Sequence, residues 1–294
     1  MNINWYPGHM AKARRMIEES IGLVDMTVEL VDARIPVASR NPDIDRILKA
    51  SQKPRMIILN KSDLADAEMN KKWLAYYKSQ GINAILYNSK TSGGSSAVYQ
   101  AVRNIFKERI ARDAAKGIVN RSIKIMVLGI PNVGKSTFIN NISGTNKARA
   151  EDRPGITRTK QWVRISDGID LLDMPGILWP KLEDQEAALR LALIGSIKDE
   201  VIDTEELAMK LAGLLARNYK PMLTARYKLP EELPEDDWEL LQLIGKKRGF
   251  VISGGEIDTE RTSLILLDEF RGCKIGKITL EKPPVTEENN EQKN

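Results

Sequence analysis

The pattern of hydrophobic and polar positions divides the chain into a part where strands and helices alternate and a later part of helices alone. Short apolar runs bounded by turn residues are typical of buried strands, and apolar positions three and four residues apart are typical of helices. Strands are predicted at 26–31, 55–59, 83–87, 123–128, 160–165 and 169–172. Helices are predicted at 10–21, 69–79, 97–116, 185–197, 204–217, 234–246 and 259–270.

Alternation of strands and helices favours an α/β fold, a mostly parallel sheet with helices on both faces. The alternation stops beyond residue 180, so we expect an α/β domain over residues 1–180 and a small all-helical domain over residues 181–280. Residues 281–294 are polar and contain proline, which predicts a disordered tail.

A glycine loop connects the strand predicted at 123–128 to a following helix. It runs from Gly129 to Ser136, and its GxxxxGKS spacing between strand and helix is that of a P-loop. The glycines let backbone N–H groups face a phosphate, Lys135 neutralises the β- and γ-phosphates as a catalytic group, and the Ser136 hydroxyl binds Mg²⁺. We therefore expect a nucleoside triphosphate to bind here, contacting Asn132, Val133, Gly134, Lys135, Ser136 and Thr137.

Two further polar motifs follow strands. Asn60, Lys61 and Asp63 form an NKxD motif, in which the carboxylate can accept from N1–H and the 2-amino group of guanine, a donor pair that adenine lacks. Asn60 can hold neighbouring loops, and the stem of Lys61 can cover the base. Such residues are also ordinary in a solvated turn. The second motif, predicted to lie near the base, is Asn88, Ser89 and Lys90.

Two segments after the P-loop are predicted to sense the γ-phosphate. The polar loop 146–160 contains Thr157 and resembles a mobile switch, so we expect Thr157 to act at Mg²⁺ and in catalysis. The strand at 169–172 ends in Asp173, a candidate for the Mg²⁺ shell, and the Gly176 N–H can meet the γ-phosphate. The predicted Mg²⁺ site therefore combines Ser136, Thr157 and Asp173.

The order of the motifs changes the prediction. The NKxD motif lies 69 residues ahead of the P-loop, instead of behind it. These strand-end motifs form a single guanine-nucleotide site if the sheet is circularly permuted. Their joint occurrence favours GTP and GDP over adenine nucleotides.

Composition adds limits on location and partners. The chain has 294 residues and one cysteine, Cys273, which excludes an internal disulfide and suits a reducing cytosol. Its amino terminus lacks the layout of a signal peptide, and no apolar run is long enough to span a membrane, so we expect a cytoplasmic protein. We also expect a monomer. The net charge of +5 permits a nucleic-acid partner without requiring one.

A basic stretch in the carboxy-terminal part is a candidate RNA contact. We read residues 217–228 as a linker that contains Tyr219 and Tyr227 but no acidic residue. Interleaved basic and aromatic side chains can bind phosphate and stack on bases, but a solvated helical face explains them equally well. The candidate RNA-binding residues are Arg217, Lys220, Arg226 and Lys228.

Taken in order, the motifs resemble those of a known family. They are an amino-terminal WYPGHM segment, a DARxP turn, NKxD, NSK, GxPNVGKS, PGxT and DxPG. This order closely resembles the circularly permuted GTPases of the YlqF/RbgA type, bacterial factors for late assembly of the large ribosomal subunit. The resemblance covers essentially the whole chain. It implies a Ras-like fold, GTP hydrolysis with Mg²⁺, and contacts of the helical domain with ribosomal RNA and the precursor large subunit.

One motif departs mildly from the family pattern. Residues 88–90 read Asn-Ser-Lys where the family usually has Ser-Ala-Lys. A backbone N–H near Ser89 or Lys90 can still meet guanine O6.

Water activation is the open step of the mechanism. Ile177 follows Gly176 where Ras-like GTPases carry a glutamine that orients water. His9, the single histidine, reads on its own as an exposed terminal residue, but the resemblance implies that it is catalytic. Asn132 matches the asparagine that helps hold K⁺ in potassium-activated GTPases, which predicts stimulation by K⁺.

Two other functions remain open. The first is a nucleotide-gated RNA-binding scaffold with negligible hydrolysis, which Ile177 favours if His9 is inert. The second is a P-loop ATPase that acts on nucleic acid, which Asp63 disfavours.

Overall fold

The computed structural model describes residues 9–89, 94–118, 121–144, 160–166, 168–178 and 184–284. The chain forms two compact units. Of the described residues, those from 9 to 178 and 279–284 form the first, here called the sheet unit, and residues 184–278 form the second, the helical unit. The chain therefore leaves the sheet unit and returns to it at residue 279.

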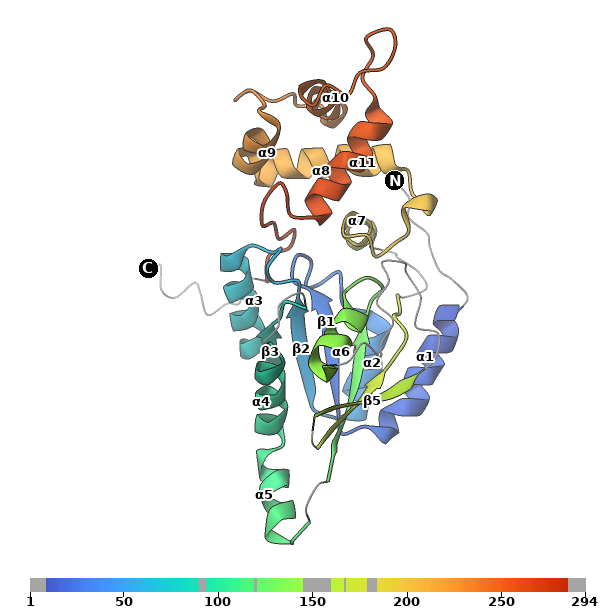
Figure 1. The fold of residues 1–294 in the computed structure, drawn as a ribbon, viewed down its shortest axis with the longest axis vertical. Helices are drawn as coiled ribbons and strands as arrows, with labels where there is room; N and C mark the ends of the chain where they lie inside the picture. Colours follow the sequence, from blue (N-terminus) through green and yellow to red (C-terminus); the bar gives the residue numbers. More distant parts are fainter. Residues whose placement is uncertain are drawn as a thin grey trace. The chain divides into compact units, whose positions relative to one another are not determined.

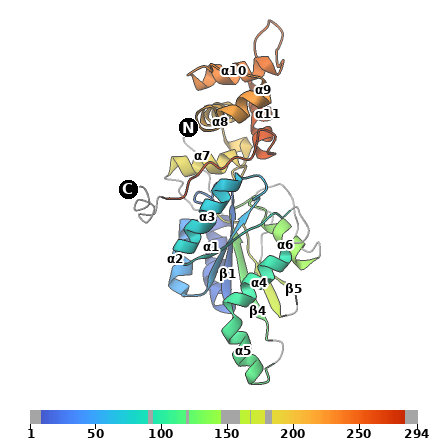
Figure 2. The same ribbon diagram turned by 90° about the vertical axis from the view of Figure 1, so that its left-hand side faces the viewer.

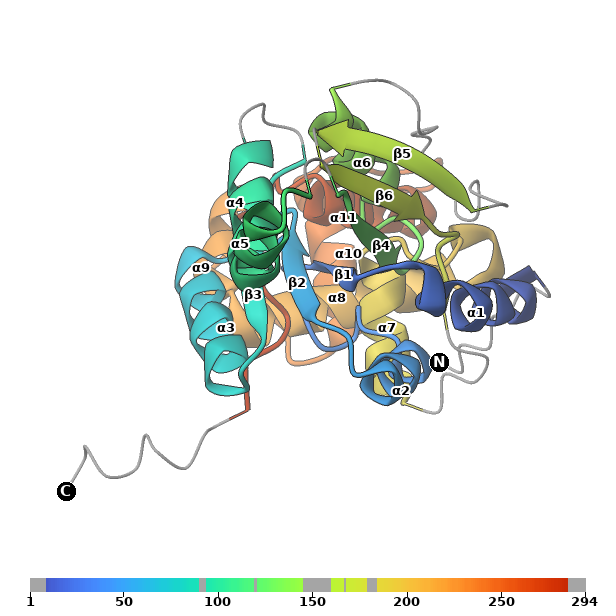
Figure 3. The same ribbon diagram turned by 90° about the horizontal axis from the view of Figure 1, so that it is seen from below.

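The sheet unit is built on six strands in the order β3-β2-β1-β4-β6-β5. All neighbours pair in parallel except β5, which is antiparallel to β6 (Figure 3). The strands are β1 (Met26–Asp32), β2 (Arg55–Asn60), β3 (Asn83–Leu86), β4 (Ile123–Gly129), β5 (Gln161–Ser166) and β6 (Ile169–Asp173). Because β1, β2, β4 and β6 are parallel, their carboxyl ends share one edge of the sheet.

Helices cover both faces of this sheet (Figure 3). In that view α1, α2 and α3 lie on one face, while α4 and α6 lie on the other. Helix α5 follows α4 end to end and extends beyond the sheet (Figures 1 and 2). The helices are α1 (His9–Ser20), η1 (Ile21–Leu23), α2 (Pro42–Ser51), α3 (Ala67–Ser79), α4 (Ser95–Ile105), α5 (Lys107–Ala115) and α6 (Lys135–Ser143).

The core of the sheet unit lies around β1 and β2. All seven residues of β1 are buried, as expected for a parallel strand covered on both faces. On the α3 face, Trp73 and Tyr77 pack with tilted rings against Val31, Ile57 and Leu59. Burial of two large aromatic side chains here fixes α3 beside the ends of β1 and β2.

The helical unit is organised around α8, which contacts each of α7, α9, α10 and α11. Two glycines permit close approach: a Cβ on Gly213 would lie 2.1 Å from Asp237 Oδ1, and one on Gly245 would lie 2.5 Å from Thr262 Oγ1. The elements are α7 (Gln185–Leu193), η2 (Asp199–Val201), α8 (Thr204–Asn218), α9 (Lys220–Tyr227), α10 (Asp237–Lys247) and α11 (Thr259–Arg271).

Buried charge ties α9 to α11. The Glu269 carboxylate is 4% exposed and accepts from the guanidinium of Arg226 and from the hydroxyl of Tyr227, at 2.5 and 2.8 Å. Arg248 also donates to it, at 3.2 Å. The hydrogen bond from Arg226 is the largest influence and, despite the desolvation, lowers the pKa of Glu269. Glu269 is therefore ionised at neutral pH, and its partners are held in place.

The predicted fold is confirmed: a mostly parallel sheet with helices on both faces precedes a set of helices. Several details differ, including the helix predicted at 185–197, which ends at Leu193, and the helix predicted at 234–246, which begins at Asp237. Helix α2 was not predicted, although Asn41 caps it and Pro42 begins it. The helix predicted at 97–116 is broken at Phe106 into α4 and α5. The stretch read as a linker at 217–228 contains α9, whose start is favoured by Pro221 in its first turn.

The carboxy-terminal tail also differs from the prediction. We expected disorder from residue 281, but Thr279 and Glu281 are buried, with 4% and 8% exposure. The Thr279 hydroxyl accepts from the Asp66 N–H at 3.0 Å, and this bond and those of Glu281, described below, explain this order. Residues 285–294 lie outside the described part of the chain. In the described part, no helix is both long and apolar enough to cross a membrane.

Candidate nucleotide-binding site

The loop from Gly129 to Lys135 connects the carboxyl end of β4 to the amino end of α6. Gly134 caps α6 with φ +93°, a conformation that favours glycine. A Cβ there would lie 2.5 Å from Asn60 Nδ2. Backbone N–H groups at a helix start form a phosphate-binding surface, so the sequence folds locally as a P-loop requires.

Asn60, at the end of β2, is hydrogen-bonded to two other segments of the site. Its Nδ2 donates to the Val133 carbonyl at 2.8 Å, and its Oδ1 accepts from the Ser89 hydroxyl at 2.8 Å. Lys61 adds a second link, since its Nζ donates to the Asn132 carbonyl at 2.7 Å. The structure thus joins the NKxD motif, the motif near Ser89 and the P-loop.

Asp63 lies in the turn after β2 and is half-buried. Ser62 fixes this turn, because its N–H and hydroxyl both donate to the Tyr87 carbonyl, at 3.2 and 3.0 Å. Among the described residues, none forms a hydrogen bond or ion pair with the Asp63 carboxylate. Both of its oxygens are therefore open to donors on a ligand, as a guanine reader requires.

Lys135 and Asp173 form a buried ion pair between the P-loop and the end of β6. The ammonium donates directly to the carboxylate, and the two residues are 6% and 3% exposed. Separating the pair leaves a cation for phosphate oxygens and a carboxylate for the shell of a metal ion. With the half-buried Ser136 hydroxyl beside them, these residues supply the oxygen donors that suit Mg²⁺.

Gly176 and Ile177 are held close to the P-loop. A Cβ on Gly176 would lie 3.2 Å from Pro131 N, and the Ile177 N–H donates to the Gly129 carbonyl at 3.2 Å. Asn41 Nδ2 donates to the Ile177 carbonyl at 3.3 Å. Since the Ile177 side chain is 3% exposed, it packs into the core and does not reach solvent as a water-orienting side chain would.

The sequence did not reveal that the turn after β1 contacts Lys61 of the NKxD motif. Burial disfavours the charged form of Asp32, but the Arg34 guanidinium and the Lys61 ammonium outweigh it, and the pKa of Asp32 lies well below its usual range. Arg34 Nε and Nη2 each donate to this carboxylate at 2.9 Å, and Lys61 Nζ lies 3.1 Å from it. The DARxP pattern at residues 32–36 was the signal of this contact in the sequence, but it indicated only a family resemblance.

Several predicted residues are placed only in part. His9 begins α1, but its side chain is outside the described part of the structure, as are Lys90 and Thr157. Asn132 has φ +58°, and its carbonyl accepts a hydrogen bond from Lys61 Nζ. Thr137 is exposed in the first turn of α6, and Asn88 is half-buried beside Ser89. The roles of these residues remain predictions.

The four candidate RNA-binding residues fall into two groups. Arg217 pairs with Asp237 at 3.0 Å, and Arg226 pairs with the buried Glu269. Lys220 and Lys228 are exposed at the two ends of α9. The structure therefore gives Arg226 a packing role that the sequence did not reveal.

The fold and this site define a circularly permuted P-loop GTPase. A family model described as a 50S ribosome-binding GTPase matches residues 124–228. Ribosome biogenesis GTPase A of Bacillus cereus is 46% identical over 96% of this chain and 95% of its own length. Its counterpart in Thermotoga maritima is 31% identical over 96% of this chain and 95% of its own length. The chain belongs to the ribosome biogenesis GTPase A family.

Solved structures agree with this assignment. The crystal structure of GNP-bound YlqF from Thermotoga maritima matches with a TM-score of 0.64 and 26% identity, over 94% of this chain and all of that one. A GDP-bound structure of TM YlqF matches with a TM-score of 0.68 and 27% identity, over 92% of this chain and all of that one. The predicted resemblance to the YlqF/RbgA family is therefore confirmed.

The Asn60 bridge predicts a stability effect. Asn60→Ala removes a donor and an acceptor, leaving the Val133 carbonyl and the Ser89 hydroxyl without their partner. We expect the free energy of unfolding of the nucleotide-free protein to fall by about 1–3 kcal/mol, measured by urea denaturation. Asn104→Ala, on the exposed side of α4, is the control and should cost less than about 0.5 kcal/mol. Equal losses in the two variants would contradict the bridge.

Proposed function

We propose that this chain is a GTP-hydrolysing assembly factor that binds the precursor large ribosomal subunit in its GTP form and leaves after hydrolysis. The observation that carries the proposal is the hydrogen bond from Asn60 to Val133, which joins the NKxD motif to the P-loop. The names of its relatives support the ribosomal part. Asp63 favours a GTPase over an ATPase, because adenine lacks the pair of donors that its carboxylate would accept from.

Different residues contact the base, the phosphates and the metal ion of bound GTP. Asp63 accepts from the guanine edge, Lys61 covers the base with its stem, and a backbone N–H near Ser89 or Lys90 meets guanine O6. Lys135 exchanges Asp173 for the phosphates, and Ser136, Thr157 and Asp173 would hold Mg²⁺. When bound, Mg²⁺ neutralises charge that develops on the phosphate oxygens during hydrolysis.

Ile177 cannot orient the attacking water, because its side chain is apolar and buried. We therefore assign that role to His9, whose neutral imidazole accepts a proton at physiological pH. His9 reaches the nucleotide when the ribosomal subunit is bound. Asn132 would help to hold K⁺, whose positive charge would stabilise the negative charge of the transition state.

Release after hydrolysis follows from the position of Gly176 in the chain. Its N–H meets the γ-phosphate, and the described part of the helical unit begins shortly afterwards, at residue 184. Loss of the γ-phosphate frees Gly176 and so alters the start of the segment that leads to the helical unit. GTP thereby favours the subunit-bound form and GDP the released form.

A second function is a nucleotide-gated RNA-binding scaffold with negligible hydrolysis. The burial of the apolar Ile177 side chain favours it if His9 is inert, because Ile177 cannot activate water. The two functions share the nucleotide site and differ only in turnover.

The first prediction of the proposal concerns turnover. Purified large ribosomal subunits should stimulate GTP hydrolysis in KCl, less so in NaCl, and His9→Ala should lose about 10²-fold of the stimulated rate because a general base is removed. Phosphate release measures the rate, and co-sedimentation checks that the variant still binds subunits.

Stimulation by subunits that His9→Ala leaves intact would contradict the assignment of His9 but keep the GTPase. No stimulation in wild type or variant would contradict the proposed enzyme and support the scaffold. Equal rates in KCl and NaCl would remove K⁺ from the proposal.

The proposed RNA contact rests on the exposed ends of α9. Lys220 and Lys228 are exposed, so their ammonium groups are available to phosphate oxygens. Arg217 and Arg226 remain candidates, but a charge reversal at Arg226 would also break its ion pair with Glu269. The lysines therefore give the cleaner test.

We predict that Lys220→Glu with Lys228→Glu weakens subunit binding and makes the negative slope of log affinity against log salt shallower by about 2, one for each lost phosphate contact. Co-sedimentation at a series of KCl concentrations measures the slope. Lys72→Glu with Lys78→Glu, exposed on α3, makes the same change of charge in the sheet unit and is the control. Equal slopes for the two double variants would remove α9 from the RNA contact.

A further inference from the structure

The last described residues of the chain form an extended segment, residues 279–284, here called the carboxy-terminal strap. The Glu281 carboxylate accepts from the N–H groups of Val37 and Ala38, at 2.5 and 3.0 Å. The Leu280 N–H donates to the Arg34 carbonyl at 2.8 Å, and Trp73 Nε1 donates to the Glu281 carbonyl at 3.2 Å. The strap thus contacts both the turn after β1 and helix α3.

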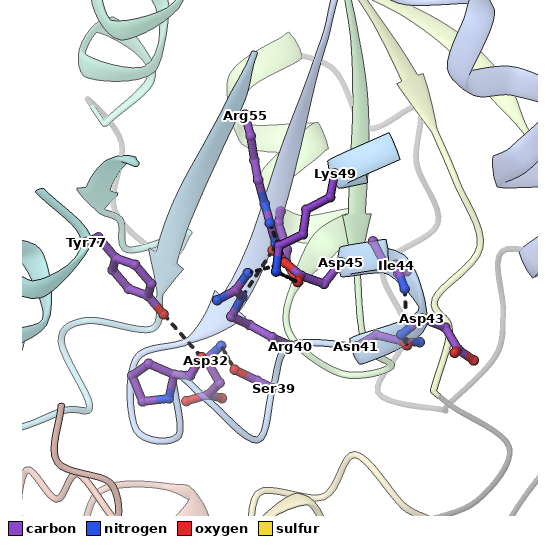
Figure 4. Close-up of polar contacts among 12 residues, drawn as sticks. Asp32, Ser39, Arg40, Asn41, Asp43, Ile44, Asp45, Lys49, Arg55 and Tyr77 are labelled. Carbon is purple, nitrogen blue, oxygen red and sulfur yellow. Dashed lines mark hydrogen bonds and ion pairs between the residues drawn. The ribbon is translucent and has the colours of Figure 1, made fainter. Parts of the chain in front are cut away.

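The turn that receives the strap, residues 33–41, is here called the β1–α2 loop. Ser39 Oγ accepts from the Asp32 N–H at 3.0 Å and donates to the Ile35 carbonyl at 2.6 Å. Tyr77 donates to the Pro36 carbonyl at 3.3 Å (Figure 4). At the far end of the loop, Arg40 pairs with Asp45 at 2.8 Å, beside Arg55 (Figure 4). The loop is therefore fixed at both ends, and the strap supports its middle.

Two contacts connect this loop to the nucleotide site. Arg34 and Asp32 form the buried ion pair described above, and Asp32 lies 3.1 Å from Lys61 Nζ. Lys61 donates in turn to the Asn132 carbonyl of the P-loop. Glu281 is thus connected to the NKxD motif and the P-loop through the backbone of the loop, the Ser39–Asp32 hydrogen bond and the ion pairs of Asp32. Asn41, the last residue of the loop, also holds Ile177.

We propose that Glu281 is a positioning residue for guanine-nucleotide binding. Its carboxylate fixes the β1–α2 loop so that Asp32 directs the Lys61 ammonium onto the P-loop carbonyl, with the Lys61 stem placed over the base. The inference rests on the proposed nucleotide site and extends it to a segment that none of the nucleotide-binding motifs includes. It makes nucleotide affinity depend on the part of the chain that follows the helical unit.

The chemistry of the side chain explains why glutamate suits this position. Two adjacent N–H groups of the loop both point at the Glu281 carboxylate, and hydrogen bonds to an anion are stronger than those to a neutral acceptor. A glutamine keeps one acceptor oxygen and supports the loop in part. An alanine leaves the N–H groups to water and removes the support.

A simpler alternative is that the strap only fastens the carboxy terminus to the sheet unit. Substitutions at Glu281 would then lower the melting temperature without a specific effect on nucleotide binding. The two roles are separated by asking whether the effect of Glu281 depends on Lys61. Double-mutant cycles measure this dependence directly.

The test measures the dissociation constant of fluorescently labelled GDP for the full chain. We expect Glu281→Ala to weaken binding about tenfold, equivalent to about 1.4 kcal/mol, and Glu281→Gln to weaken it less. In a Lys61→Ala background both substitutions should have no further effect, because the contact they support is gone. The KM for GTP should rise with an unchanged kcat. Lys282→Ala, exposed on the same strap, is the control and should bind GDP as the wild type does.

An unchanged dissociation constant in Glu281→Ala, or an equal fold-loss in the Lys61→Ala background, would overturn the proposal. If Glu281→Ala does not fold, Glu281→Gln provides the same comparison with less disturbance. Failure of the wild type to bind GDP would instead contradict the proposed function, so the two failures are distinguishable.

Discussion

The hydrogen bond from Asn60 to Val133 is the interaction on which the nucleotide site depends. It fastens the end of β2 to the P-loop after β4, although the two residues are 73 positions apart. Since β1 lies between these strands, the bond crosses the middle of the sheet edge. The Ser89 hydroxyl completes the bridge. With the Lys61 hydrogen bond to the Asn132 carbonyl, it holds the NKxD turn against the P-loop.

The parallel sheet explains why the permuted order of motifs leaves this site intact. Strand β1 is the first strand in the sequence but lies in the centre of the sheet, with β2 and β4 paired in parallel on either side. In a parallel sheet the strand ends that line the ligand crevice are set by strand neighbours, not by the order of strands in the chain. Moving the guanine motif ahead of the P-loop therefore preserves their proximity.

The sequence predicted what depends on local pattern. Apolar runs located the strands, and polar motifs at their ends indicated a nucleotide site. Helix α2 was missed, although Asn41 and Pro42 form a recognisable start. The contacts of Glu281 with Val37 and of Arg226 with Glu269 could not be predicted, because they join residues 244 and 43 positions apart and have no local signal.

The most direct test of a permuted guanine site is competition between nucleotides for the protein loaded with fluorescent GDP. GDP should displace the probe best, IDP less well because it lacks the 2-amino group that Asp63 accepts, and ADP least because it offers neither donor. Comparable displacement by GDP and ADP would contradict the guanine-reading role of Asp63 and the joining of these motifs into one GTP site.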